Sequence, residues 1–178
     1  MKIYRFKFDV GTFQQFGTDD DGYFGRRPRR CKPTPMPWVP PEVYICNPLD
    51  EAGDFCYLLE PVASPKAMRV VGDILKPCCE LLPLPFDGRT FTLINVLTCV
   101  DCVDHTRSRL TSDCYNNVYA FLPERVPKVP IFTIPKFEYL EVFTAERTGD
   151  PKTEFKAAVE HHGLKGLIFT RVWEGCKV

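Results

Sequence analysis

Seventeen prolines distributed over 178 residues constrain the fold of this chain more than any other feature. Proline lacks a backbone N–H and fixes φ near −65°, so it ends helices and is confined to the edges and ends of strands. Fourteen Phe and seven Tyr still provide the apolar bulk of a core, which a disordered chain does not have. We therefore expect residues 1–178 to form one globular domain of many short segments, without a helical bundle.

Two helices are expected from local signals. Ser64 is a good N-cap and Pro65 suits the first helical position, so a helix should begin there and end before Pro77. A second helix is expected to begin at Asp150 and Pro151 and to run to His162, which precedes a candidate C-cap glycine. Its predicted buried face consists of Phe155, Ala158, Val159 and His162.

Strands account for most of the remaining apolar pattern. Lys2–Val10 alternates in the manner of a strand, which predicts a first strand with its aromatic residues toward the core. Asp87-Gly88 predicts a turn between two strands. The predicted strands are Val43–Cys46, Phe55–Leu59, Glu80–Leu84, Thr90–Thr98, Arg107–Leu110, Val118–Leu122, Ile131–Ile134, Tyr139–Phe143 and Leu167–Trp173. This order predicts an α+β fold with a mixed, mostly antiparallel sheet and two short helices.

Residues 11–41 differ from the rest and are expected to form an irregular, Pro- and Arg-rich N-terminal arm. Arginine forks and aromatic rings are typical of protein interfaces. The candidate partner-binding residues are Asp19, Asp20, Asp21, Tyr23, Phe24, Arg26, Arg27, Arg29, Arg30, Lys32 and Trp38. A solvated loop explains the same residues, and so does nucleic-acid binding, although 23 basic against 23 acidic residues disfavours the latter.

The nine cysteines leave a metal- or thiol-dependent module as an alternative function. Cys99 and Cys102 have the C-x2-C spacing of a zinc site, with His105 and Cys114 nearby. No second pair completes the ligand set, so we expect free thiols, no metal and no cofactor. The sequence also lacks a phosphate loop, a G-x-S-x-G elbow and an H-E-x-x-H helix, and we expect no enzymatic activity.

The expected location is the cytoplasm. Arg5, Lys7 and Asp9 stand where a secretory signal would be apolar. The longest mostly apolar stretch, Phe91–Val100, has about half the length of a membrane-spanning helix. These observations predict a protein without a membrane segment.

Several segments together resemble immunity family eleven of bacterial polymorphic toxin systems. The segments that carry the resemblance are Lys2–Tyr4, Glu80–Leu84, Ile94–Val96, Val100–Asp104, Ile131–Pro135 and Phe155–Phe169, followed by Trp173. The most specific part is the last helix with the sequence GLKGLIFTRVW after it. The resemblance implies a non-enzymatic cytoplasmic protein that binds and neutralises a cognate toxin by occlusion. It implies no catalytic residues and does not extend to residues 11–60.

Overall fold

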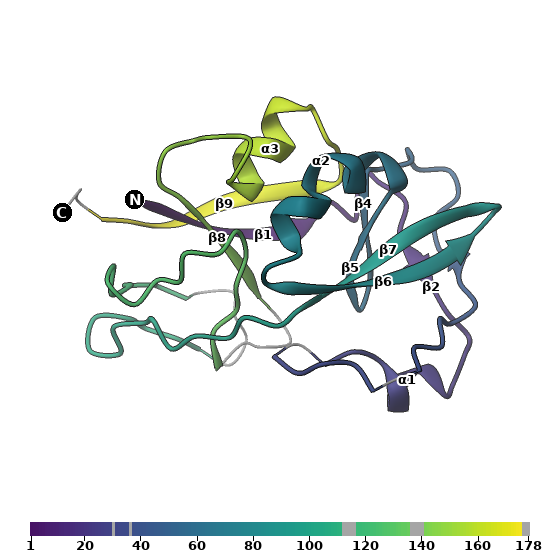
Figure 1. The fold of residues 1–178 in the computed structure, drawn as a ribbon, viewed down its shortest axis with the longest axis horizontal. Coiled ribbons are helices and arrows are strands. Elements are labelled where there is room, and N and C mark those ends of the chain that lie inside the picture. Colours follow the sequence, from purple (N-terminus) through teal and green to yellow (C-terminus); the bar gives the residue numbers. More distant parts are fainter. Residues whose placement is uncertain (30, 36, 112–116, 136–140, 176–178) are drawn as a thin grey trace.

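The computed structural model describes residues 1–29, 31–35, 37–111, 117–135 and 141–175. Within these residues the fold combines β-strands with a few small helices (Figure 1). The elements in chain order are β1 (Lys2–Phe8), β2 (Phe16–Gly17), α1 (Tyr23–Arg26), β3 (Tyr44–Ile45), β4 (Phe55–Leu58), β5 (Glu60–Ala63), α2 (Pro65–Leu75), β6 (Cys79–Phe86), β7 (Arg89–Val96), β8 (Val142–Glu146), α3 (Phe155–His161) and β9 (Leu167–Glu174).

The strands form three sheets, with the orders β8-β1-β9, β4-β5-β7-β6 and β2-β3. Every pairing within these sheets is antiparallel, and parallel pairing occurs as isolated bridges such as the one between Cys99 and Thr133. The expected α+β class with mostly antiparallel strands is confirmed. The structure adds a third short helix, α1, which lies within the arm predicted to be irregular.

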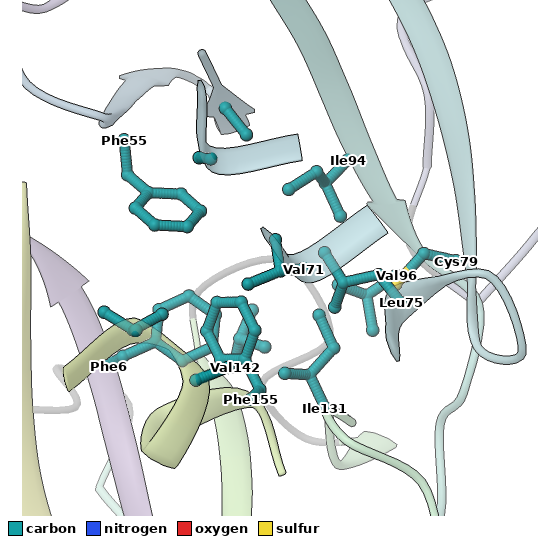
Figure 2. Close-up of a cluster of buried hydrophobic side chains, with 14 of the residues drawn as sticks. Phe6, Phe55, Val71, Leu75, Cys79, Ile94, Val96, Ile131, Val142 and Phe155 are labelled. Carbon is teal, nitrogen blue, oxygen red and sulfur yellow. The ribbon is translucent and has the colours of Figure 1, made fainter. Parts of the chain in front are cut away.

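Helix α2 has the bounds that its capping signals predict. Ser64 is the N-cap, and its Oγ accepts a hydrogen bond from the Ala67 N–H at 3.1 Å. The buried face of the helix includes Ala67, Val71 and Leu75, whose spacing follows the helical repeat. This face packs into the main core between the two larger sheets, where Figure 2 shows Val71 and Leu75 with Phe55 and Ile94.

Helix α3 begins at Phe155, four residues later than the predicted start at Pro151. Asp150 instead closes a turn, in which its Oδ1 accepts a hydrogen bond from the Lys152 N–H at 2.9 Å. The Glu154 carboxylate then accepts hydrogen bonds from the backbone N–H groups of residues 147–149, at 2.9–3.0 Å. This carboxylate holds the preceding loop and leaves the helix to start one residue after Glu154.

The buried face of α3 is confirmed for three of its four predicted members. Phe155, Ala158 and Val159 are buried, and the Phe155 ring lies 5.4 Å from the Phe6 ring between centroids. His162 is exposed, because it stands at the C-cap, where the chain leaves the helical path. The chain reverses there through a glycine with φ of 59°, and the following Leu164 is buried, as expected of a left-handed C-cap.

Three predicted strands between residues 107 and 134 are reduced to isolated bridges. Arg109 pairs with Val118, and Phe132 pairs with Phe143, without continuing into ladders. Pro130 and Pro135 flank the predicted strand Ile131–Ile134 and lack the backbone N–H groups that would extend its pairing. The apolar residues of this region instead fill a second core by side-chain packing, largely aromatic, with Tyr119, Phe121, Phe132 and Phe143. The predicted strand Tyr139–Phe143 lies partly outside the described residues.

One hairpin was missed and one was anticipated. The predicted strand Phe55–Leu59 ends in a reversal at Leu59, whose φ is 61°, and the chain returns as β5. A leucine with positive φ gives no sequence signal, since such positions favour glycine or asparagine. By contrast, Asp87 and Gly88 both have positive φ, as the Asp-Gly signal predicts for the β6–β7 turn.

Candidate protein-binding surface

The predicted arm does not extend from the molecule but lies along the β6–β7 hairpin. The Cys31 N–H donates to the Val96 carbonyl oxygen at 2.8 Å. Farther along, the Trp38 Nε1–H donates to the Pro83 carbonyl oxygen, also at 2.8 Å. Pro83 lies on β6, the edge strand of its sheet, and the outward carbonyl groups of an edge strand are open to a neighbouring segment. The arm is therefore a docked part of the domain.

Glu80, which is partly exposed, and the buried Asn95 form a polar clamp beneath the arm. The Glu80 Oε2 accepts hydrogen bonds from the backbone N–H and the hydroxyl of Thr34, both at 2.8 Å. It also accepts from the Asn95 Nδ2 at 2.8 Å, and the same amide donates to the Lys32 carbonyl oxygen at 3.0 Å. Thr34 and Asn95 are buried, so these bonds fix the middle of the arm on the sheet.

Tyr23, predicted to contact a partner, is fully buried at 0% exposure and belongs to the core under the arm. Its hydroxyl has no hydrogen-bond partner among the described residues. Burial and the nearby charge of Glu60 raise the pKa of Tyr23. Tyr23 therefore anchors the arm from inside, and its neighbour Phe24 is the aromatic residue that faces solvent, with 58% exposure.

The predicted basic cluster is divided by internal ion pairs. Arg26 pairs with Asp20, and this hydrogen-bonded contact lowers the pKa of Asp20 and raises that of Arg26. Arg27 lies 3.6 Å from the buried carboxylate of Glu60. The other predicted basic residues differ from these: Arg29 and Lys32 are exposed, and Arg30 lies outside the described residues. Arg26 and Arg27 thus stabilise the arm itself.

Acidic and apolar side chains of the arm and of residues 42–44 after it meet around a groove of about 610 Å³, which we call the acidic groove. Its lining consists of Asp19, Asp20, Arg26, Val39, Pro40, Glu42, Val43 and Tyr44. Val39 and Tyr44 are large apolar side chains with 50% and 45% exposure. Sequence reasoning identified Asp19, Asp20 and Arg26 but missed Val39, Glu42 and Tyr44. The predicted strand Val43–Cys46 was the available signal, because alternation in a strand leaves Tyr44 on the outer face.

The walls of the acidic groove are held by local bonds. The Thr18 hydroxyl donates to the Glu42 carbonyl oxygen at 2.6 Å and accepts from the Asp20 N–H at 3.1 Å. The Tyr44 ring lies against Gly17, where an added Cβ would stand 2.7 Å from the ring. The charge of Asp19 raises the pKa of Tyr44. The groove is therefore preformed, which lowers the ordering cost of binding.

The residues named for the alternative metal or thiol module do not form a metal-binding group in the described part of the chain. Cys102 is buried, and burial raises the pKa of its thiol to about 12. His105 is bonded instead through its Nε2 to the Asp101 carboxylate, at 3.0 Å. Cys114 lies outside the described residues, and within the described ranges no three His, Cys, Asp or Glu residues are grouped so that they could hold a metal ion. The metal or thiol module stays a prediction without a described site.

Comparisons with family models, with curated proteins and with solved structures gave no significant match. The resemblance to the immunity family therefore rests on the sequence segments that carry it. In the part of the chain that the structure describes, no helix combines the length and the apolar character needed to cross a membrane.

Proposed function

We propose that this chain acts by binding another protein rather than by catalysis. The observation that carries the proposal is the acidic groove, in which exposed carboxylates flank the exposed side chains of Val39 and Tyr44 on a locally bonded scaffold. Aromatic anchors surrounded by polar groups are typical of binding hot spots. More specifically, the chain is proposed to be a cytoplasmic immunity protein that occludes a cognate toxin, as the resemblance implies.

The charge of the acidic groove selects the partner surface. Asp19 and Glu42 are exposed, as is the adjacent Asp21, whereas the guanidinium of Arg26, the only one among the described lining residues, is paired with Asp20. Opposite charges across an interface steer association and fix orientation. The proposed partner therefore presents a basic surface, and the carboxylates rather than the arginines of the arm make the charged contacts.

Charge reversal at the acidic groove tests whether the chain binds a toxin domain and whether the acidic groove makes the charged contacts. The genes beside this one are searched for a toxin domain, and the double variant Asp19→Lys/Glu42→Lys and the control Glu124→Lys, an exposed glutamate outside the groove, are titrated against the domain found there. We expect at least tenfold weaker binding for the double variant, a weaker salt dependence, and no change for the control.

The two possible failures are distinguishable. Absence of binding between the wild-type chain and that toxin domain would contradict the immunity function. Binding that is equal for the wild type and the double variant would retain the function and remove the acidic groove from the interface. Protection of cells that express the toxin provides a second readout of the same variants.

A further inference from the structure

A second groove, of about 380 Å³, lies between the start of α2, the tip of the β6–β7 hairpin and the β2–β3 pair. Phe16 and Ile45 are partners in the β2–β3 register and line this groove, whereas the next pair, Gly17 and Tyr44, adjoins the acidic groove. Successive strand residues point to opposite faces. The β2–β3 pair therefore separates the two grooves. We call the second one the basic groove.

The floor of the basic groove is a rigid aromatic cluster. The Phe16 ring lies 5.0 Å from the Phe86 ring and 5.2 Å from the Phe91 ring, both in edge-to-face contact. Phe16 and Phe91 are nearly buried, whereas Phe86 and Ile45 are partly exposed toward the groove. Such a floor offers apolar contact to a flat ligand without rearrangement.

Cations stand on both sides of this floor. Lys66 and Arg69 are three residues apart on α2 and line one side, and Arg89 lines the other from the start of β7. The Arg89 guanidinium lies 5.4 Å from the centre of the Phe91 ring. This cation–π contact holds the Arg89 side chain beside the floor.

One carboxylate, that of Asp54, also lines the basic groove and is already neutralised. It accepts hydrogen bonds from the Lys66 ammonium at 2.9 Å and from the Lys165 N–H at 3.0 Å. Arg69 forms no ion pair with any residue in the described ranges, and the contact of Arg89 with Asp87 is long, at 3.8 Å, and exposed. The lining therefore keeps an excess of positive charge from Arg69 and Arg89.

We propose that the basic groove binds a small organic anion with an aromatic ring, such as an aromatic carboxylate. The ring would lie on Phe16 and Phe86, with the carboxylate toward Arg69 and Arg89, whose guanidinium groups match carboxylate geometry. The volume falls within the range of small-molecule sites. The proposal is independent of the partner assigned to the acidic groove.

Titration of the whole chain with 2-naphthoate, followed by backbone amide NMR, tests the site. Saturable shifts confined to residues 64–69 and 86–91 and the β2–β3 pair are expected, at millimolar or lower dissociation constants. The neutral analogue 2-naphthamide should bind at least tenfold more weakly. Equal binding of the two probes, absence of saturation, or shifts centred elsewhere would overturn the proposal.

Matched variants test the role of the two arginines. Arg69→Gln/Arg89→Gln should weaken 2-naphthoate binding at least tenfold and leave 2-naphthamide binding unchanged. Lys128→Gln removes an exposed cation outside the groove and should change neither. Both arginines are exposed, so the double variant should fold as the wild type does. Amide spectra of the free variants check that each is folded. Unchanged naphthoate affinity in the double variant would overturn the proposal.

Discussion

The main core and the arm are stabilised in different ways. In the core, α2 and α3 pack against the sheets through many apolar contacts, among them those of Phe55, Val71 and Phe155 (Figure 2). The arm is attached at separate points, chiefly the buried Tyr23 ring and the hydrogen bonds of Glu80. Apolar burial spreads stability over many residues, whereas the arm depends on a few bonds that single substitutions remove.

The largest effect is expected from Phe155→Ala in the main core. The ring is 1% exposed and lies 5.4 Å from Phe6 and 5.9 Å from Phe55 between centroids. Its removal leaves a cavity, so the free energy of unfolding should fall by about 3–5 kcal/mol. Urea unfolding measures this change.

Phe24→Ala is the matched control, because Phe24 is an exposed phenylalanine of the arm. Its free energy of unfolding should stay within about 0.5 kcal/mol of the wild-type value. A loss below about 1 kcal/mol for Phe155→Ala would show that α3 does not bury this ring as described.

An intermediate effect is expected from Glu80→Ala beneath the arm. The substitution leaves the two donors of Thr34 and the Asn95 amide without their acceptor, at a cost of about 1–3 kcal/mol. Amide hydrogen exchange should accelerate at Cys31 and Thr34, while Val71 in α2 keeps its protection. Equal acceleration at all three amides would contradict a separately attached arm, and Glu124→Ala serves as the control.

A smaller effect is expected from Tyr23→Phe. The Tyr23 hydroxyl is buried without a hydrogen-bond partner in the described part of the chain, so its removal abolishes a desolvation cost. Stability measured by urea unfolding should be unchanged or rise by up to about 1 kcal/mol. Destabilisation by more than about 1 kcal/mol would indicate a bonded hydroxyl.

The smallest effect is local and depends on pH. The hydrogen bond from Arg26 holds the pKa of Asp20 below its ordinary value of 3.8. Because this pKa is lowered in the folded chain, the pair is intact above pH 3.8 and is lost as the pH falls through the lowered value. The Arg26 side-chain NMR signal should therefore titrate with a midpoint below 3.8, and Asp20→Asn should remove this titration. A midpoint at or above 3.8 would contradict the pairing.

Elements with local determinants were predictable from the sequence. Helix α2 has its cap, its first-turn proline and its buried face within twelve residues, and the Asp87-Gly88 turn depends on two. The start of α3 was not predictable. It depends on the hydrogen bonds that the Glu154 carboxylate accepts from residues 147–149, and the helical spacing of apolar residues gives no sign of these bonds.

Docking of the arm on the β6–β7 hairpin was not predictable from the sequence for a related reason, because its contacts join residues that are far apart in the chain. Thr34 meets Glu80 across 46 residues, and composition alone does not distinguish the buried Tyr23 from the exposed Phe24 beside it. Two acidic residues of the candidate site, Asp19 and Asp20, were predicted because they belong to a visible charge run, whereas Glu42 was missed. The apolar half of the site, with Tyr44, depends on the β2–β3 pairing and on the space above Gly17.

The central position of β1 has a consequence for synthesis of the chain. β1 lies between β8 and β9, so its partners follow about 140 and 160 residues later in the sequence. At a synthesis rate of roughly 5–20 residues per second, β8 is made roughly 7–30 s after Ile3 and Phe6. In the nascent chain β1 is thus made well before the two strands that pair with it, and closing this sheet is a late, long-range event in folding.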